Sequence, residues 1–328
     1  MNVIVYHPPS PGCENSAKIL AAAISASPAA RDATVRILNL LPAPRPRLLE
    51  TVPPLGDVDC AIFMERMIDH PSLLEARHRI LVPNPEWLVP QTLNLASRCT
   101  EVWHKSHFSL DRLAPVLPAA RHAYLGFGSA DPGLRVQDHR DFLHLRGKIG
   151  TRRNTAAILS LWHSRRELPN LHVHLYADAD GDSGLDYPGW LHDRNVHVRL
   201  GWLDRPDYWA LATRHGVHLC TSEVEGFGHY IDEARALGSL VVTVDGAPMN
   251  ELVDHGSGVL VRPRSTVPMR FGTRFQIGPD ELAEAIDRVL GLGPEARRDL
   301  GNAARQRFED EGQRFRSNAN DLFTGLRG

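Results

Sequence analysis

Short apolar runs alternate with amphipathic segments along the whole chain. In the first part, the apolar runs predict β-strands at 3–6, 35–38, 60–64, 80–82, 101–103 and 123–125. A helix is predicted at 15–25, because Ala17, Leu20 and Ile24 recur on one helical face. Strands that alternate with helices form a parallel sheet that is covered on both faces.

A second series of the same kind follows. It predicts strands at 142–145, 173–176, 196–199, 217–220, 240–244 and 258–261, and helices at 154–163, 231–237 and 281–290. The stretch 126–141, rich in Gly, Asp and Pro, separates the two series. The sequence therefore predicts an α/β protein with two tandem Rossmann-like, doubly wound domains, 1–138 and 139–311, that face each other across a cleft. A C-terminal helix at about 312–328 can pack back on the first domain.

Composition agrees with two folded domains and narrows the function classes. The 328 residues are enough for two cores, and 37 Lys and Arg against 39 Asp and Glu give a net charge of -2. This balance provides no overall basic excess for nucleic acid or an anionic membrane. The four cysteines lie far apart without a C-x-x-C pair, which excludes a zinc ribbon and a disulfide scaffold.

The cysteine pattern is typical of a reducing compartment. The apolar run at 3–6 follows no cationic segment, so we predict no signal peptide. The blandest stretch, 17–30, is interrupted by Ser25, Ser27 and Pro28 and is too short to span a bilayer. We expect a cytoplasmic protein without a transmembrane segment, and peripheral membrane contact stays open.

The most informative segment runs from Val217 to Glu233 and reads VHLCTSEVEGFGHYIDE. An apolar strand leads into a turn with Gly226 and Gly228, and a helix follows. Glycines let the backbone approach a ligand closely, and the amides at a helix start can bind an anion. Glu225 in the loop and Glu233 on the second helical turn can point at the same ligand. The alternative interpretation is an ordinary strand–turn–helix with two solvated glutamates.

Four segments, in the correct order, resemble the retaining GT-B glycosyltransferases, especially glycosyltransferase family 4. The pair Glu225 and Glu233, with EGFG at 225–228, is similar to the E-x7-E motif of that family. The other three segments are HPPSPGCE at 7–14, LRGKIGTRRN at 145–154 and the stretch 245–261. They are similar to the family's glycine-rich loop after the first strand, its basic loop opening the second domain, and its segment after the E-x7-E helix.

The sequence departs from the family pattern at three residues and in the length of one segment. Cys13 stands where the family has a second glycine, Lys148 stands at the family's arginine, and Arg153 stands at its lysine. A positive charge is kept at both positions, but the planar, bidentate guanidinium and the single ammonium group have changed places. The segment between Arg262 and Gly278 is longer than the family leads us to expect.

The resemblance implies metal-independent transfer of a sugar from a nucleotide-diphosphate sugar, with retention of configuration. Lys148 and Arg153 would neutralise the diphosphate, and Glu225 would contact the transferred sugar; we assign these three as catalytic. Glu233 would accept hydrogen bonds from the ribose. Further donor contacts are predicted for Gly12, Gly201, Trp202, Gly226, Phe227, Gly228, Asn250 and Glu251.

The acceptor is predicted to bind mostly on the first domain, near the ends of its strands. The candidate residues are His7, Cys13, His70, Asn84 and Glu86. For each of them a structural role is favoured over a direct contact with the acceptor. The acceptor class stays open between a glycan, a lipid and a small molecule, with a protein or nucleic acid less favoured.

No cofactor and no metal ligand is predicted. The D-x-D pairs at 57–59 and 178–180 have the spacing of a divalent-ion motif, but we interpret them as turn and cap residues. His172 and His174 alternate along one strand, where a zinc site would need a third ligand. The arginine-rich segment 262–274 is interpreted as a solvated loop, with proximity to an acidic ligand as the alternative.

Two other functions stay open beside glycosyl transfer. One is another GT-B enzyme, such as a sugar-nucleotide epimerase or a phosphorylase. The other is a non-catalytic protein that binds a nucleotide sugar.

Overall fold

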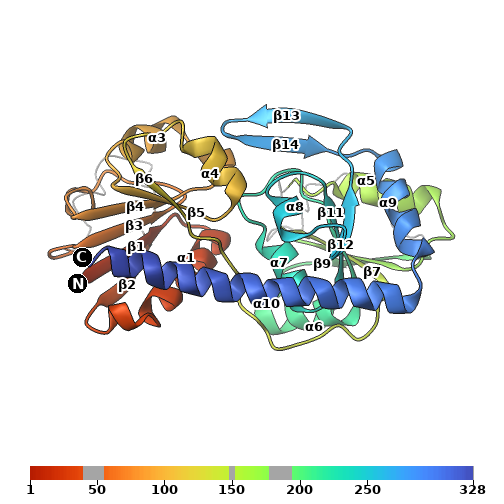
Figure 1. The fold of residues 1–328 in the computed structure, drawn as a ribbon. Helices are drawn as coiled ribbons and strands as arrows, with labels where there is room; N and C mark the ends of the chain where they lie inside the picture. The colour runs from red at the N-terminus through yellow and green to blue at the C-terminus, as the bar shows by residue number, and fades with distance from the viewer. Residues whose placement is uncertain (40–54, 148–151, 177–193, 328) are drawn as a thin grey trace. The chain divides into compact units, whose positions relative to one another are not determined.

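The computed structural model describes residues 1–39, 55–147, 152–176 and 194–327, which form two compact units (Figure 1). The first unit comprises 1–129, 268–272 and 311–328, and the second comprises 130–267 and 273–310. The chain therefore passes from the first unit to the second at 129/130, inside the Gly-, Asp- and Pro-rich stretch. It re-enters the first unit briefly at 268–272 and returns to it finally at 310/311.

A six-stranded parallel sheet forms the centre of the first unit. Its strands are β1 (Asn2–His7), β2 (Thr34–Asn39), β3 (Cys60–Met64), β4 (His78–Val82), β5 (Glu101–His104) and β6 (Arg121–Tyr124). They lie in the order β2-β1-β3-β4-β5-β6, and the register pairs Ile4 with Ala61 and Ile62 with Ile80. β3 is buried at every position, whereas β2 at the edge is half exposed, because only inner strands are covered on both faces.

Short helices connect these strands. They are α1 (Pro11–Ser25), α2 (Pro71–Leu74), α3 (Pro90–Ala96) and α4 (His107–Leu113), with 3-10 turns at Pro28–Ala30 and Pro85–Trp87. α1 begins four residues before the predicted start. Ser10 caps it by accepting a hydrogen bond from the amide of Cys13, and Pro11 occupies the first helical position, where no amide donor is needed.

The second unit is built on another six-stranded parallel sheet. Its strands are β7 (Phe142–Gly147), β8 (Leu171–Leu175), β9 (Val196–Leu200), β10 (Val217–Cys220), β11 (Leu240–Val244) and β12 (Gly258–Val261). They lie in the order β9-β8-β7-β10-β11-β12, which is the strand order of dinucleotide-binding Rossmann domains. The predicted class, α/β with two doubly wound parallel sheets, is confirmed.

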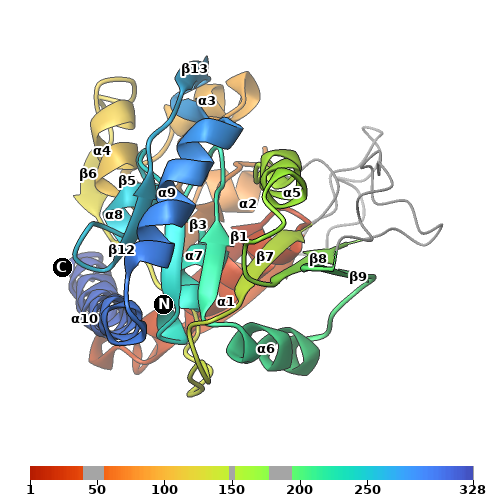
Figure 2. The same ribbon diagram turned by 90° about the vertical axis from the view of Figure 1, so that its right-hand side faces the viewer.

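Helices cover both faces of the second sheet (Figure 2). Phe142 points to one face, where its ring meets the edge of Trp162 on α5 (Thr155–Ser164), and α9 (Pro279–Gly291) packs beside α5. The next residue, Leu143, points to the other face, where it packs with residues of α6 (Arg205–Arg214). α7 (His229–Ala236) and α8 (Met249–Leu252) follow β10 and β11.

The arginine-rich segment, interpreted from the sequence as a loop, is a two-stranded hairpin of β13 (Ser265–Met269) and β14 (Gly272–Gln276). Its arginines contact protein groups. Arg264 lies 2.9 Å from Asp280 and 3.0 Å from Glu281, and Arg274 pairs with Glu223. The charge density of this segment is therefore explained by local ion pairs and does not require an acidic ligand.

The chain ends in a helix of 32 residues, α10 (Pro294–Gly325), which is longer than the predicted 312–328. Its last part belongs to the first unit. Phe315 lies 4.9 Å from Phe127 between ring centroids, Phe323 is fully buried, and Ser27 donates a hydrogen bond of 2.6 Å to Asn320. Within the described residues, no helix is both long and apolar enough to cross a membrane.

Close backbone packing in the second sheet leads to the first prediction. A Cβ at Gly258 would lie 2.5 Å from the carbonyl oxygen of Val241 and 2.5 Å from Cγ1 of Val253. Gly258→Ala should therefore lower the free energy of unfolding by ~1–3 kcal/mol, as overpacked cores do. Urea denaturation would measure the change. Gly291→Ala is the control, because a Cβ there meets nothing within 4 Å, and equal stability of the two variants would contradict the prediction.

Candidate functional site

The order of the second sheet reverses between β7 and β10, and the loops after these two strands are tied together. The side chain of Asn154 donates to the carbonyl of Thr221 at 2.9 Å, and the Thr221 hydroxyl donates to the carbonyl of Arg153 at 2.9 Å. The amide of Glu223 donates to the carbonyl of Arg152 at 2.8 Å. Open α/β sheets bind ligands outside the carboxyl ends of their strands at such a reversal. This edge is the candidate site of the second unit.

Glu225 lies in the loop that joins β10 to α7. The hydroxyl of Ser222 donates to its Oε1 at 2.6 Å and lies 2.7 Å from the hydroxyl of Tyr230. Ser222 is buried, and Glu225 is half buried. The serine therefore fixes the direction of a carboxylate that keeps access to solvent.

Glu233 is more deeply held, on the second turn of α7. Its Oε2 accepts a hydrogen bond of 2.6 Å from the hydroxyl of Tyr208, and its Oε1 lies 2.9 Å from Nη1 of Arg205. Burial, followed by the charge of Glu233, raises the pKa of Tyr208 well above its usual value. The phenol thus stays protonated and donates. Each carboxylate oxygen retains a second lone pair for a ligand hydroxyl.

Arg205 and Tyr208 are functional-site residues that the sequence analysis missed. Both lie on α6, whose sequence shows no apolar stripe that would predict a helix, because Ala212 is its only buried residue. Asp204 caps this helix by accepting from the amide of Asp207, and this cap, with Pro206 in the first turn, is the sequence signal that could have located it.

Arg153 lies at the start of α5, beside the reversal point. Its guanidinium carbon lies 3.6 Å from the ring centroid of Tyr230, and Nη1 donates to the carbonyl of Leu145 at 2.6 Å. The stacked, anchored guanidinium is thus pre-positioned beside the loop that carries Glu225. Lys148, its predicted partner in binding a diphosphate, lies outside the described residues.

The glycine loop has the geometry that a close backbone approach needs. Gly228 caps α7 with a φ of 98°, a left-handed conformation that favours glycine, and no side chain caps the helix there. Gly226 and Phe227 are buried. The start of α7 therefore presents backbone rather than side chains at the edge of the sheet.

The remaining donor-side residues follow neighbouring strands of the same sheet. Gly201 and Trp202 come directly after β9, and Trp202 has 67% of its surface exposed, with Tyr176 meeting it edge-on at 5.9 Å. Asn250 and Glu251 lie on α8 after β11. The described residues that are predicted to bind the donor thus follow strands of one sheet at its carboxyl edge, except Gly12, which lies in α1 of the first unit.

A polar cluster lies at the carboxyl edge of the first sheet and centres on Glu65, which directly follows β3. Its carboxylate accepts from the Cys13 thiol at 3.0 Å and from the Asn84 side chain at 2.6 Å, and Nζ of Lys105 lies 3.8 Å away. Burial raises the pKa of Cys13 to about 12, so the thiol is protonated and donates. Glu65 and Lys105 were missed by the sequence analysis, because single charges after strands are common.

Two buried polar atoms in this region have no hydrogen-bond partner within the described residues. They are Nδ1 of His70 and Oδ1 of Asn84. Buried polar atoms are nearly always hydrogen-bonded in native proteins, so a ligand or water is the expected partner. His7 instead bonds the carbonyl of Pro8 at 2.9 Å, and Glu86 is buried in the turn Pro85–Trp87.

The first D-x-D pair has a structural role. Asp59 accepts from the amide of Asn2 at 2.7 Å, and the carbonyl of Asp57 accepts from the Asn2 side chain at 2.6 Å. The pair at 178–180 lies outside the described residues.

Comparisons with known proteins agree with this geometry. Residues 191–307 match the family model of glycosyl transferases group 1. The whole chain superposes on sucrose-phosphate synthase from Thermosynechococcus elongatus with a TM-score of 0.71 and 14% identity, covering 100% of this chain and 99% of that one. The chain has a GT-B fold.

Two further structures give the same result. HepE from Anabaena, solved in complex with UDP and glucose, has a TM-score of 0.65 and 14% identity, covering 98% of each chain. A trehalose-6-phosphate synthase has a TM-score of 0.62 and 13% identity, covering 99% of this chain and 98% of that one. No curated protein has a sequence that matches significantly. At these identities the similarity shows the fold alone.

The contacts of Glu233 lead to the second prediction. Tyr208→Phe removes a hydrogen bond to a buried charge and leaves the ring in place. It should lower the free energy of unfolding at pH 7 by ~1.5–3 kcal/mol. Urea denaturation followed by circular dichroism measures the loss. Tyr176→Phe, which changes a phenol on the same unit, is the control; a loss of equal size there would show that Glu233 does not use Tyr208 as a donor.

Proposed function

We propose that this protein is a retaining glycosyltransferase that moves a sugar from a nucleotide-diphosphate sugar to an acceptor, without a metal ion. The observation that carries the proposal is the pair Glu225 and Glu233, oriented by Ser222 and by Tyr208 with Arg205, at the reversal point of a Rossmann-like sheet. The family match over 191–307 includes this segment.

In this proposal the second unit binds the donor. Breaking the bond between sugar and phosphate builds negative charge on the leaving diphosphate, and preorganised positive groups must stabilise it. Arg153 supplies one of them, the backbone at the start of α7 supplies oriented dipoles, and Lys148 supplies the second cation. Glu233 accepts from the ribose, Glu225 holds hydroxyls of the sugar, and Trp202 lies beside the base.

The first unit binds the acceptor. The unsatisfied Nδ1 of His70 and Oδ1 of Asn84 support this assignment, since acceptor hydroxyls can serve both as donors and as acceptors. Glu65 orients Asn84 from the other side of its amide.

In this proposal the acceptor hydroxyl attacks the anomeric carbon from the same face that the leaving phosphate departs from, so the configuration of the sugar is retained. The departing phosphate takes the proton of the acceptor hydroxyl, so no carboxylate nucleophile is needed, in contrast to retaining glycosidases with their paired carboxyl groups. The trehalose-6-phosphate synthase structure with this fold was described in a study of glycosyl transfer with retention. Glu225 is accordingly a positioning group.

Hydrolysis of nucleotide sugars tests the proposal against its alternatives. A thermal-shift panel of UDP, GDP, ADP and TDP with their sugars identifies the donor, and the chosen donor is then incubated with the enzyme. Slow release of sugar with retained configuration supports a glycosyltransferase. Release of an epimer indicates an epimerase, phosphate-dependent cleavage indicates a phosphorylase, and tight binding without turnover indicates a binding protein.

The third prediction separates the two glutamates. Glu233→Ala should weaken binding of the nucleoside diphosphate ~10–150-fold, which is the loss of one charge-assisted hydrogen-bonding group of ~1.5–3 kcal/mol. Glu225→Ala should leave diphosphate binding nearly unchanged and lower kcat instead, because it acts on the sugar as charge develops. Calorimetry and steady-state kinetics measure the two effects. Glu295→Ala, an exposed glutamate on α10, is the control.

Equal losses of diphosphate affinity in the two variants, or the reverse pattern, would contradict this division of roles. Such a result would leave the enzyme class untouched.

The fourth prediction concerns metal dependence. Because side chains and amides neutralise the diphosphate in this proposal, transfer should keep its rate after exhaustive treatment with EDTA. Loss of transfer that Mg²⁺ or Mn²⁺ restores would show that a metal ion binds the diphosphate instead.

A further inference from the structure

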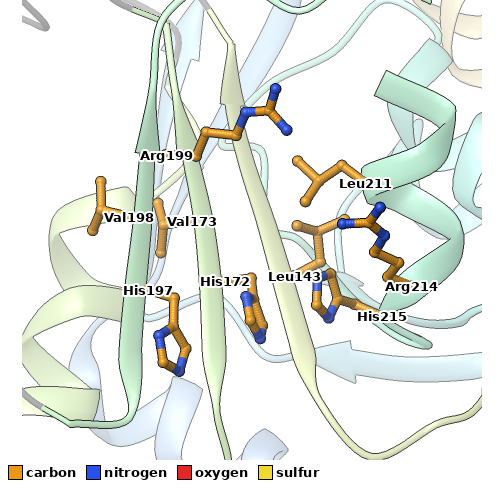
Figure 3. Close-up of a pocket in the computed structure, with 9 residues that line it drawn as sticks. All are labelled: Leu143, His172, Val173, His197, Val198, Arg199, Leu211, Arg214 and His215. Carbon is orange, nitrogen blue, oxygen red and sulfur yellow. The ribbon is translucent and has the colours of Figure 1, made fainter. Parts of the chain in front are cut away.

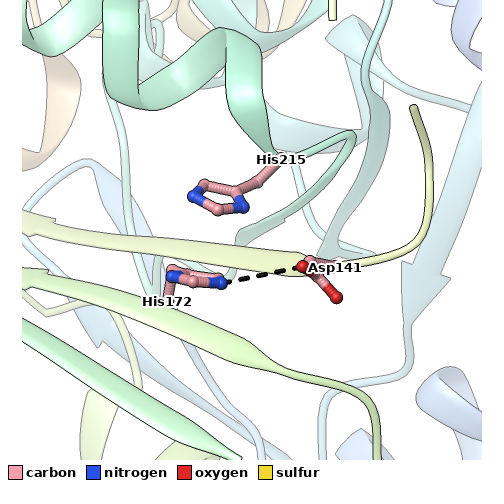
Figure 4. Close-up of side chains that lie close together, drawn as sticks. All are labelled: Asp141, His172 and His215. Carbon is pink, nitrogen blue, oxygen red and sulfur yellow. Dashed lines mark ion pairs between the residues drawn. The ribbon is translucent and has the colours of Figure 1, made fainter. Parts of the chain in front are cut away.

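A second cluster of polar side chains lies at the amino end of the second sheet, opposite to the edge that carries the candidate donor site. Asp141 directly precedes β7, His172 lies near the start of β8, and His215 directly follows α6, before β10 begins (Figure 4). One ligand atom from each residue lies within 4.8 Å of the other two. Three segments that are distant in sequence thus converge on one point.

The register of the sheet explains the convergence. His172 pairs with Leu143, so both side chains point to the face that α6 covers. His215 ends α6 on that face, and its ring stacks on that of His172 at 3.8 Å between centroids. Nε2 of His172 lies 3.8 Å from Oδ2 of Asp141.

One atom of this cluster is unsatisfied. His215 has only 7% of its surface exposed, and its Nδ1 has no hydrogen-bond partner within the described residues. A buried ring nitrogen without a partner is costly unless a ligand or water satisfies it. This is the observation that distinguishes the cluster from an ordinary group of surface histidines.

Space for a ligand is present beside the cluster. A pocket of about 410 Å³ is lined by His172, His215, His197 and Leu143, with Arg214 beside His215 and Arg199 farther along it (Figure 3). His197 stacks on His172 at 4.7 Å. Arg199 is paired with Asp207 at 3.3 Å, which reduces its repulsion of a cation.

The donor set has a definite chemical preference. Two imidazoles and one carboxylate suit borderline divalent ions such as Zn²⁺, with water completing the coordination. Ligand atoms at about 2.1 Å from a tetrahedral zinc ion lie about 3.4 Å apart. The 3.8 Å between His172 and Asp141 is close to this spacing, whereas the three atoms together lie within 4.8 Å of one another. The stacked imidazole rings must therefore rotate so that both nitrogens point at one ion.

We propose that Asp141, His172 and His215 form a binding site for a divalent transition-metal ion, with Zn²⁺ as the probe. The ion joins β7, β8 and the end of α6. Since α6 also carries Arg205 and Tyr208, which hold Glu233, the ion stabilises the helix that supports the donor-side carboxylate. It takes no part in transfer.

Metal titration of the full chain, purified without a histidine tag, tests this site. Wild-type protein should bind one equivalent of Zn²⁺, and Co²⁺ should give the visible absorption of a site with nitrogen and oxygen ligands. His172→Ala and His215→Ala should each weaken Zn²⁺ binding at least tenfold and abolish the Co²⁺ band. Asp141→Asn, which keeps shape and volume, should weaken binding as well.

Two control variants separate this site from general binding to histidines or charges. His255→Ala removes an exposed histidine elsewhere in the second unit, and Arg214→Ala removes a cation of the pocket; neither should weaken Zn²⁺ binding. Zinc affinity that is unchanged in His172→Ala and Asp141→Asn would overturn the proposal. So would a wild-type protein that binds no Zn²⁺ below about 1 mM. These two variants decide the question even if His215→Ala fails to fold.

Discussion

The reversal of strand order between β7 and β10 is the constraint on which the second unit depends. All strands of this sheet run parallel, so their carboxyl ends share one edge. At the reversal, the chain leaves β7 toward one face and β10 toward the other, which separates α5 from α7. The separation exposes backbone at the start of α7 and lets side chains from both loops meet, and the hydrogen bonds of Thr221 with Arg153 and Asn154 fix their spacing.

Burial of Glu233 shows how such a site is supported from a distance. A carboxylate that is taken out of water is stable only if it is paired and hydrogen-bonded. Here a half-exposed arginine and a half-buried tyrosine on α6 provide that compensation. The position of one helix thereby sets the position of a residue that lies on another. His215, from the histidine cluster, directly follows the other end of the same helix.

The sequence predicted the buried strands well and the exposed helices poorly. β3, β10, β11 and β12 have the predicted bounds, because a strand buried on both faces reads as an uninterrupted apolar run. α6 presents one buried residue, so no periodic apolar pattern marks it. The hairpin at 265–276 was missed because its strands are largely exposed.

The residues of the candidate site also fall into two groups, those that lie together in the sequence and those that only the fold brings together. Glu225, Glu233 and the glycine loop lie within one short segment, so local spacing and the family resemblance can suggest them, and their roles stay a prediction. Arg205 and Tyr208, which contact Glu233, reach it only through the tertiary fold. The same holds for the residues that gather around Glu65. The two further ligands that a zinc site on His172 would need could come only from other segments, at Asp141 and His215, whereas His174 on the same strand bonds the carbonyl of Gly201.

The course of α10 has a consequence for biosynthesis. The first unit consists of residues 1–129 together with the last residues of the chain, and Phe315, Ala319 and Phe323 are buried in it. On the ribosome, domains usually fold in the order in which they are made. Here the unit that is made first cannot complete its core until the final helix has left the exit tunnel, whereas the second unit has all its residues earlier. The C-terminal unit can therefore reach its final fold while the N-terminal one still exposes apolar surface to chaperones.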